Sequence, residues 1–244
     1  MTTKKKLSRR EREEQAVTRR YMLIGGGAVA VAAAAGIGMT MMPPSFPVVA
    51  GKATLDERIA QAGIQDHLLR LAGEGEKTDL MVIGNTECIY CQKFIKDGLG
   101  DLVSLAKEKG LTLSYAAIGG GASSLGSTRL MSCFARGSEA KPEKILREVY
   151  AAGDAMRAGA SFEDTARRHG ETLGVSEADI EACLAEDPLE ATARIQATTR
   201  AFEIAGTPMF YVASPKDATT IRWFSGFSGP GAMVRQLDNA LELG

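Results

Sequence analysis

The sequence predicts a mixed α/β domain that is interrupted by a long helical segment. Three patterns predict it: a strand pattern at 80–83 followed by a helical pattern, helical spacing throughout 122–205, and two further strand patterns before a C-terminal helix. The 244 residues suffice for one domain of ordinary size with appendages. The net charge of -1 indicates neither a nucleic acid nor an acidic partner.

The first 42 residues predict a membrane-targeting segment. Residues 1–20 carry eight basic and three acidic side chains, and the 22 residues of 21–42 carry no charge. A helix of about 20 apolar residues crosses a bilayer, and the basic flank stays cytoplasmic. Residues 18–23 resemble a twin-arginine export signal. We expect a cytoplasmic basic tail over 1–20 and a transmembrane anchor over 21–42; an export signal cleaved near Ala50 is the alternative.

The segment 43–76 predicts a linker that becomes a helix over 54–73. Its apolar residues follow three- and four-residue steps and form a thin stripe: Leu55, Ile59, Ala62, Leu69 and Ala72. Such a stripe needs a partner, which is either the same domain or a surface outside it, as in self-association. His67 lies beside the stripe without a second metal ligand at suitable spacing, so we interpret it as an ordinary surface histidine.

A βαβ unit is expected over 77–121. The apolar run 80–83 predicts a buried strand, the next segment keeps helical spacing until Gly110, and 111–117 alternates like a second strand. A strand, a crossover helix and a second strand of this length form a parallel pair. The three glycines at 119–121 lack the context of a phosphate-binding loop.

The segment 122–205 predicts a helical insertion between two parts of the α/β domain. Several residues are typical of helix starts: Pro142, Ser161, Ser176 and Asp187. Cys133 and Cys183 lie in this segment among apolar neighbours. A disulfide between them would close a 50-residue loop, worth about 4 kcal/mol in the chain-entropy model. Two buried free thiols and a second redox pair are the alternatives.

Residues 206–244 predict a ββα unit. Pro208 opens an apolar strand after Gly206 and Thr207, where a proline is permitted and a cis bond is expected. A second strand at 220–224 precedes a helix with apolar spacing. Together with the βαβ unit over 77–121, this ββα unit predicts the thioredoxin fold with a helical insertion.

Cys88 and Cys91 form a Cys-x-x-Cys motif where the first helix of this fold begins. Unpaired N–H groups and the positive end of the helix dipole favour a thiolate there, which makes Cys88 a nucleophile near neutral pH. Cys91 lies one turn further on and can resolve a mixed disulfide. The motif alone fits half of a zinc site, a redox dithiol or chance.

The motif at a helix start, the helical insertion, and the Gly-Thr-Pro sequence ending at Pro208 together resemble the Dsb group of bacterial extracytoplasmic thiol-disulfide oxidoreductases. The resemblance covers roughly 78–243. Tyr90 in the motif and Thr207 before the proline resemble the DsbC/DsbG isomerases and reductases rather than the DsbA oxidases. The insertion is closer in size to that of DsbA, so a DsbA-like disulfide-forming oxidase is the alternative.

The resemblance implies roles for the cysteines and for the proline loop. Cys88 would attack a substrate disulfide and Cys91 would resolve the mixed disulfide. Thr207 and Pro208 would form a cis-proline loop that lies against the motif and binds an extended substrate chain. Cys133 and Cys183 would fill the place of the structural disulfide of DsbC-like domains.

Three residues flank the motif: Glu87, Ile89 and Tyr90. Thioredoxin and DsbA carry a buried acid six residues before the first cysteine, where this chain has Val82. Glu87 is then the remaining proton relay, although an exposed carboxylate is the simpler interpretation. Because Tyr90 replaces the histidine of DsbA, we expect a milder oxidant.

The same resemblance implies the setting of the protein. The expected partners are cysteine-containing envelope proteins and a membrane redox partner, on the periplasmic side of the inner membrane, with no cofactor, metal or nucleic acid. DsbC dimerises through a separate domain, for which this chain has no room, so a homodimer would use the helix at 54–73. A Cu or Zn metallochaperone, which thiolates also suit, and a catalytically silent envelope scaffold are the alternatives of other classes.

Overall fold

The computed structural model describes residues 46–242 of the chain. The predicted basic tail over 1–20 and the predicted membrane segment over 21–42 lie outside these residues. Within 46–242, no helix has both the length and the apolar character that crossing a membrane requires.

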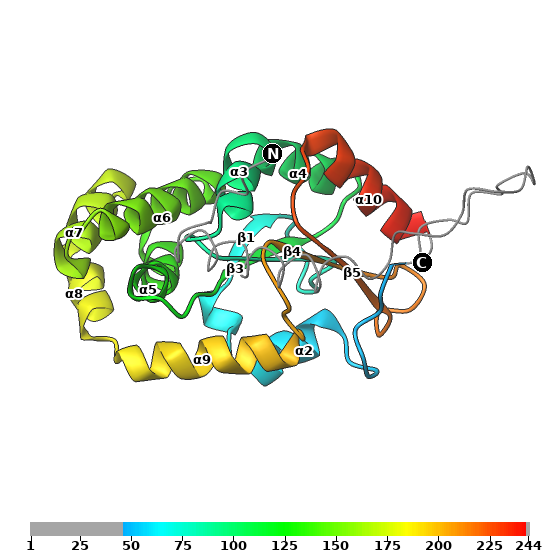
Figure 1. Ribbon diagram of the computed structural model, residues 1–244, viewed down its shortest axis with the longest axis horizontal. Coiled ribbons are helices and arrows are strands. Elements are labelled where there is room, and N and C mark those ends of the chain that lie inside the picture. The colour runs from blue at the N-terminus through cyan, green and yellow to red at the C-terminus, as the bar shows by residue number, and fades with distance from the viewer. Residues whose placement is uncertain (1–45, 243–244) are drawn as a thin grey trace, which may run out of the picture. The chain divides into compact units, whose positions relative to one another are not determined.

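One mixed sheet forms the centre of the fold, with the strand order β1-β3-β2-β4-β5 (Figure 1). The strands are β1 Leu69–Ala72, β2 Leu80–Gly84, β3 Leu113–Ala117, β4 Met209–Ala213 and β5 Ile221–Ser225. β2 and β3 run parallel, whereas the other neighbouring pairs are antiparallel. β2 and β3 are buried along their whole length, which explains their continuous apolar runs.

Helices cover both faces of this sheet. They are α2 Leu55–Ala62, α3 Ile89–Asp97, α4 Leu99–Glu108, α5 Ala122–Gly137, α6 Pro142–Arg157, α7 Phe162–Leu173, α8 Glu177–Ala185, α9 Pro188–Ala201 and α10 Pro230–Glu242. α3, α4 and α10 lie on one face and α2 and α9 on the other, while α5 to α8 gather at one end (Figure 1). The βαβ unit, the helical insertion and the ββα unit are therefore arranged as predicted.

Alternate side chains of the strands enter two separate apolar cores. Val82 and Phe210 pack in the core on the side of α3 and α10. Met81, Ile83 and Tyr211 pack in the core on the side of α2 and α9. Successive strand residues point to opposite faces, so helices on both sides of the sheet bury every position of the central strands β2 and β3.

The prediction of a single helix over 54–73 is wrong beyond Ala62. Gly63 has a φ of 64°, and this left-handed turn ends α2. A short 3-10 helix, η1 Gln65–His67, then leads into β1, which pairs antiparallel with β3. The apolar stripe of α2 is buried within the domain beside α9, so this surface is not open for self-association.

The predicted continuous helix after the cysteine motif is in fact two helices that meet at Gly98. A Cβ atom on Gly98 would lie 2.5 Å from a ring carbon of Phe227. This close approach lets Phe227 pack against Phe94, with ring centroids 5.7 Å apart. Glycine at the break therefore allows the loop before α10 to close over the start of α4.

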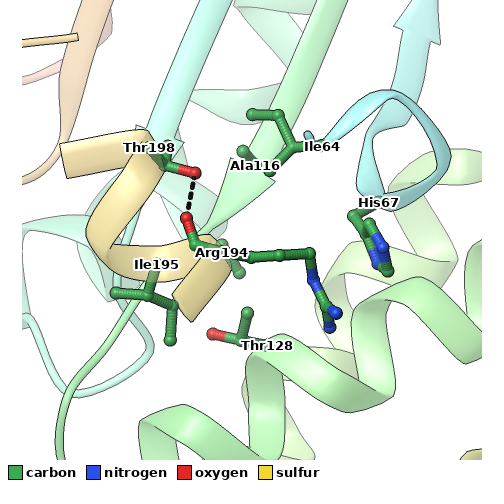
Figure 2. Close-up of a pocket in the computed structure, with 8 residues that line it drawn as sticks. Ile64, His67, Ala116, Thr128, Arg194, Ile195 and Thr198 are labelled. Atoms are coloured by element: carbon green, nitrogen blue, oxygen red, sulfur yellow. Dashed lines mark hydrogen bonds between the residues drawn. The ribbon is translucent and has the colours of Figure 1, made fainter. Parts of the chain in front are cut away.

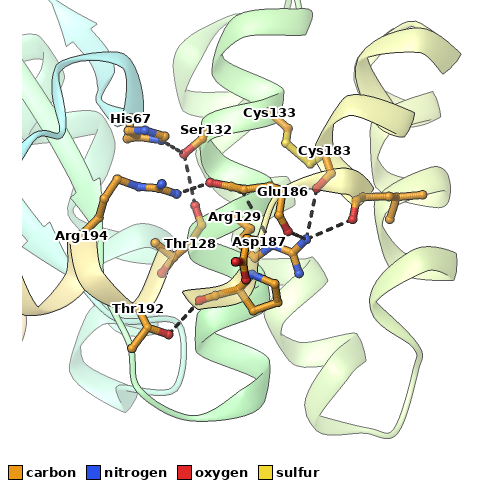
Figure 3. Close-up of polar contacts among 12 residues, drawn as sticks. His67, Thr128, Arg129, Ser132, Cys133, Cys183, Glu186, Asp187, Thr192 and Arg194 are labelled. Carbon is orange, nitrogen blue, oxygen red and sulfur yellow. Dashed lines mark hydrogen bonds and ion pairs between the residues drawn. A yellow bond between two sulfur atoms is a disulfide. The ribbon is translucent and has the colours of Figure 1, made fainter. Parts of the chain in front are cut away.

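A disulfide between Cys133 of α5 and Cys183 of α8 joins two helices of the insertion (Figure 3). Arg129, one turn before Cys133, donates to the carbonyl oxygens of Cys183 at 3.2 Å and of Glu186 at 2.7 Å. The last carbonyls of a helix have no partner inside the helix. Arg129 therefore donates hydrogen bonds to carbonyl groups at the C-terminal end of α8, next to the disulfide that links α8 to α5.

His67 is half-buried, so its interpretation as a surface histidine is wrong. η1 places its Nδ1 against the hydroxyl of Ser132 on α5 (Figure 3). Burial, together with the nearby charge of Arg194, lowers the pKa of His67. Figure 2 shows Arg194 reaching from α9 toward His67 across Thr128. The cavity among them measures about 10 Å³, which leaves space for one water molecule at most.

Candidate active site

Cys88 occupies the N-cap position of α3, directly after the loop that leaves β2. The loop turns because the side-chain oxygen of Asn85 accepts a hydrogen bond from the Glu87 N–H at 2.8 Å, and the Asn85 carbonyl accepts one from the Cys88 N–H at 3.1 Å. The Cys88 carbonyl then begins the helix by accepting from the Gln92 N–H at 3.0 Å. The Cys88 sulfur thus lies where the N–H groups of the first helical turn are unpaired.

The cis-proline loop lies against Cys88. The peptide bond between Thr207 and Pro208 is cis, and the Cys88 thiol donates to the Thr207 carbonyl at 3.1 Å. The Gly226 N–H donates to the Pro208 carbonyl at 2.9 Å, which ties this loop to the end of β5. The fold therefore brings together residues that are 119 positions apart in the sequence.

The pKa of Cys88 is lowered overall. Partial burial by itself raises the pKa, but hydrogen bonding with the side chains of Thr207 and Cys91, and with the N–H groups of Cys91 and Tyr90, outweighs it. No capping hydrogen bond to the neutral thiol is formed, so these N–H groups remain available to a thiolate. Cys88 is thus a half-exposed sulfur in surroundings that favour its charged, nucleophilic form.

Cys91 has the opposite surroundings. Its side chain is completely buried, and this burial raises the pKa of its thiol to about 12. Its sulfur accepts one hydrogen bond, from the Asn85 N–H at 3.4 Å. The two free cysteines of the described chain therefore differ in solvent exposure and in acidity: Cys88 is partly exposed and the more acidic thiol, and Cys91 is buried and the less acidic one.

Two tyrosine hydroxyls lie beside Cys91, a contact that the sequence did not predict. Tyr115 comes from β3 and Tyr150 from α6, and their hydroxyl oxygens are 2.6 Å apart. Burial is the main cause that raises the pKa of both phenols, and interaction with Cys91 raises them further. Tyrosines at core positions signal buried polar tips that need partners, but the sequence does not show that these two meet.

Glu87 is exposed but engaged by α5. Its carboxylate accepts hydrogen bonds from the Ser123 hydroxyl and from the Ser124 N–H, the latter at 3.3 Å. A carboxylate at a helix N-terminus satisfies unpaired N–H groups and complements the dipole. This contact gives Glu87 a structural role in joining the motif to the insertion.

Ile89 and Tyr90 form an exposed apolar surface beside Cys88. Their exposed fractions are 59% and 53%, although both belong to the first turn of α3. The Lys93 ammonium lies 5.8 Å from the centroid of the Tyr90 ring. Large apolar side chains that remain exposed at the rim of a reactive group provide a surface on which a second chain can bind.

The described part of the chain, 46–242, contains no cluster of three or more histidine, cysteine, aspartate or glutamate side chains suited to a metal ion. Cys88 and Cys91 have no third ligand of these types beside them. The groups around the two sulfurs are hydroxyls, backbone N–H groups and a carbonyl oxygen.

The sheet order, the helical insertion and the cis-proline opposite a Cys-x-x-Cys are those of a thioredoxin-like fold that contains a helical insertion. No model of a known protein family matches the sequence, and no curated protein matches it. The structure is similar to that of α-DsbA1 from Wolbachia pipientis, with a TM-score of 0.56 and 12% identity over 71% of this chain and 89% of that one. It is also similar to a linker-deletion variant of ScsC from Proteus mirabilis, with a TM-score of 0.50 and 15% identity over 99% of this chain and 100% of that one.

Proposed function

We propose that this protein is an extracytoplasmic thiol-disulfide oxidoreductase that acts on protein disulfides through Cys88 and Cys91. The observation that carries the proposal is the position of the Cys88 sulfur: half-exposed at the start of α3 and 3.1 Å from the carbonyl before the cis-proline. Cys91 lies buried one helical turn away. This is an arrangement in which one thiolate attacks from the surface and a second thiol closes a disulfide behind it.

The proposed reaction has two exchange steps. The Cys88 thiolate attacks one sulfur of a substrate disulfide, forms a mixed disulfide and releases the other substrate sulfur as a thiolate. Cys91, after losing its proton, attacks the Cys88 sulfur; the Cys88–Cys91 disulfide forms and the second substrate thiolate leaves. The substrate gains two electrons and the protein loses two. If a substrate thiol attacks the mixed disulfide instead, the substrate is isomerised.

Substrate binding is proposed on the surface around Cys88. Ile89 and Tyr90 offer apolar contact that does not depend on one particular sequence. An extended peptide has room to pair with the backbone beside Thr207, because a loop with a cis bond is not part of the ladder of β4. Backbone pairing together with apolar contact suits protein substrates that differ in sequence.

We propose the reductase or isomerase direction rather than the oxidase direction. Tyr90 contributes no positive charge beside the Cys88 thiolate, and the Lys93 ammonium lies over the face of the Tyr90 ring. A thiolate with less stabilisation makes the disulfide form less oxidising. The potential of the Cys88–Cys91 pair, measured in glutathione buffers, tests this point: a potential as oxidising as that of DsbA favours the oxidase.

The proposed location is the periplasmic side of the inner membrane, with 21–42 as an uncleaved anchor. The disulfide between Cys133 and Cys183 supports an oxidising compartment. Residues 47–49 lie along the sheet edge: the Val49 N–H donates to the Ile221 carbonyl at 2.9 Å, and the Val49 side chain is buried. Cleavage near Ala50 would remove these contacts. The mass of the protein extracted from membranes distinguishes an intact N-terminus from a cleaved one.

Insulin reduction and the refolding of scrambled ribonuclease test the proposed activity. The wild-type protein should be active in a reductant-dependent manner, Cys88→Ser should be inactive, and Cys91→Ser should accumulate mixed disulfides with envelope proteins. A protein with no thiol-dependent activity that binds Cu(I) or Zn tightly at one equivalent would instead be a metallochaperone. The burial of Cys91 argues against that outcome, because only one of the two sulfurs is open to a partner.

A further inference from the structure

Three elements of the fold bring hydroxyl and thiol groups together beneath the exposed cysteine. Cys91 comes from α3, Tyr115 from β3 and Tyr150 from α6. The two hydroxyl oxygens are 2.6 Å apart, and the Tyr150 hydroxyl lies beside the Cys91 side chain. All three side chains are at most 5% exposed. This group is a buried chain of exchangeable protons that ends on a reacting atom.

The backbone leaves space for this chain where β2 ends. A Cβ atom on Gly84 would lie 1.8 Å from the Tyr115 hydroxyl and 2.8 Å from the Tyr150 hydroxyl. The next residue, Asn85, donates its N–H to the Cys91 sulfur. Val82 faces Tyr115 across the β2–β3 ladder and brings no titratable group. The phenols therefore occupy the polar position beside Cys91.

Each hydroxyl carries one proton, which limits how the chain can be arranged. While Cys91 is a thiol, its proton can point to Tyr150 and the Tyr150 proton to Tyr115. When Cys91 is a thiolate, the Tyr115 proton can point to Tyr150 and the Tyr150 proton to the sulfur. Rotation of the two O–H bonds changes one arrangement into the other without moving a heavy atom.

We propose that Tyr150 is a catalytic hydrogen-bond donor to the Cys91 thiolate and that Tyr115 is the residue that positions it. The proposal rests on the proposed function, because it concerns the exchange step in which Cys91 reacts. In that step the Cys91 proton leaves to water, the Cys91 sulfur bonds to the Cys88 sulfur, and the bond from Cys88 to the substrate sulfur breaks. The substrate thiolate then takes a proton from water. In the reverse direction Cys91 is the leaving thiolate and receives the same hydrogen bond.

The size of the effect follows from the hydrogen bond that is lost. One hydrogen bond to a charged group contributes enough to change the thiolate fraction by about tenfold. A thiolate of higher pKa is also more nucleophilic, which restores about threefold of this loss. Without the Tyr150 hydroxyl, the closing step should therefore be about threefold slower at neutral pH.

A coloured aromatic disulfide separates the two steps in stopped-flow measurements. Reduced protein releases one coloured thiol when Cys88 attacks and a second when Cys91 closes the disulfide. Tyr150→Phe should leave the first phase unchanged and slow the second about threefold. Tyr115→Phe should slow the second phase to a smaller extent. Tyr211→Phe is the matched control, because its buried hydroxyl donates to the Phe202 carbonyl at 2.7 Å in the other core.

The outcomes separate this proposal from the proposed function. If the wild-type protein lacks either phase, the dithiol chemistry itself is refuted. If both phases are present but Tyr150→Phe and Tyr211→Phe give the same second phase, only the role of Tyr150 is refuted. Equal slowing of both phases by Tyr150→Phe would also refute it, because that pattern indicates a general distortion of the site. Slowing confined to the second phase, present at each pH between about 6 and 8, supports the proposal.

Discussion

Removal of the disulfide in the helical insertion should weaken the fold and leave the redox site intact. Cys133 and Cys183 are 3% and 1% exposed, so alanine is the appropriate replacement; serine would add a buried hydroxyl. The two cysteines are separated by 50 positions. For a loop of this length the chain-entropy model gives a loss of about 4 kcal/mol in the free energy of unfolding. For a domain of this size, that loss corresponds to a Tm lower by about 8 to 16 °C.

Urea unfolding followed by circular dichroism measures this loss in the Cys133→Ala/Cys183→Ala variant. The Arg129 contacts to the end of α8 do not involve the sulfur atoms and should keep α8 in place below the Tm. Both phases of the reaction with an aromatic disulfide should therefore equal those of the wild type at 25 °C, where the variant is folded. A loss below about 1 kcal/mol would show that the loop is already restrained in the unfolded state. A changed first phase would contradict the separation of the two cysteine pairs.

Three further perturbations follow from the same contacts. His67→Gln should flatten the pH dependence of stability measured by urea unfolding. Burial lowers the pKa of folded His67 below its ordinary 6.5, so the unfolded state takes up the proton first. The wild type therefore loses stability as the pH falls through 6.5, and the variant should not show this loss. Gly84→Ala should lower the free energy of unfolding by about 3 kcal/mol and slow the second phase, because the added methyl group meets the Tyr115 hydroxyl. Gly100→Ala is the control: the space around Gly100 is open, so its free energy of unfolding should change little. Ile89→Ser should raise the KM for insulin up to about tenfold, while the first phase with a small aromatic disulfide stays unchanged.

Much of the fold was predictable because local pattern and global structure agree in this chain. The apolar run of β2, the cysteines at the start of α3 and the proline directly before β4 each give a local signal for the element that they belong to or precede. Their order along the chain then leaves few topologies. The cysteine motif acquires a distinct meaning only in combination with Pro208, since either signal alone fits other structures.

The missed features all depend on contacts between distant segments. β1 has only four residues, and its apolar positions also fit the three- and four-residue steps of the helix pattern that begins in α2. Gly63, which has a left-handed conformation, is the local signal that α2 ends before β1 begins. The burial of His67 depends on Ser132, 65 positions away. The meeting of Tyr115 and Tyr150 at Cys91 requires a strand and two helices to converge, which hydrophobic periodicity does not specify.

The difference in acidity between Cys88 and Cys91 is produced by parts of the chain that lie on opposite sides of the dithiol. Thr207, whose side chain hydrogen-bonds Cys88 and lowers the pKa of its thiol against the effect of burial, reaches it only when β4 pairs with β2. Tyr150, which lies beside the buried Cys91, belongs to the helical insertion. The motif alone would place two cysteines on one helix. The pairing of β4 with β2 brings Thr207 to Cys88 and lowers the pKa of that thiol, whereas α6 of the insertion helps to bury Cys91. The helical insertion is therefore part of the proposed active site, and changes in α6 should alter the closing step even where they leave Cys88 untouched.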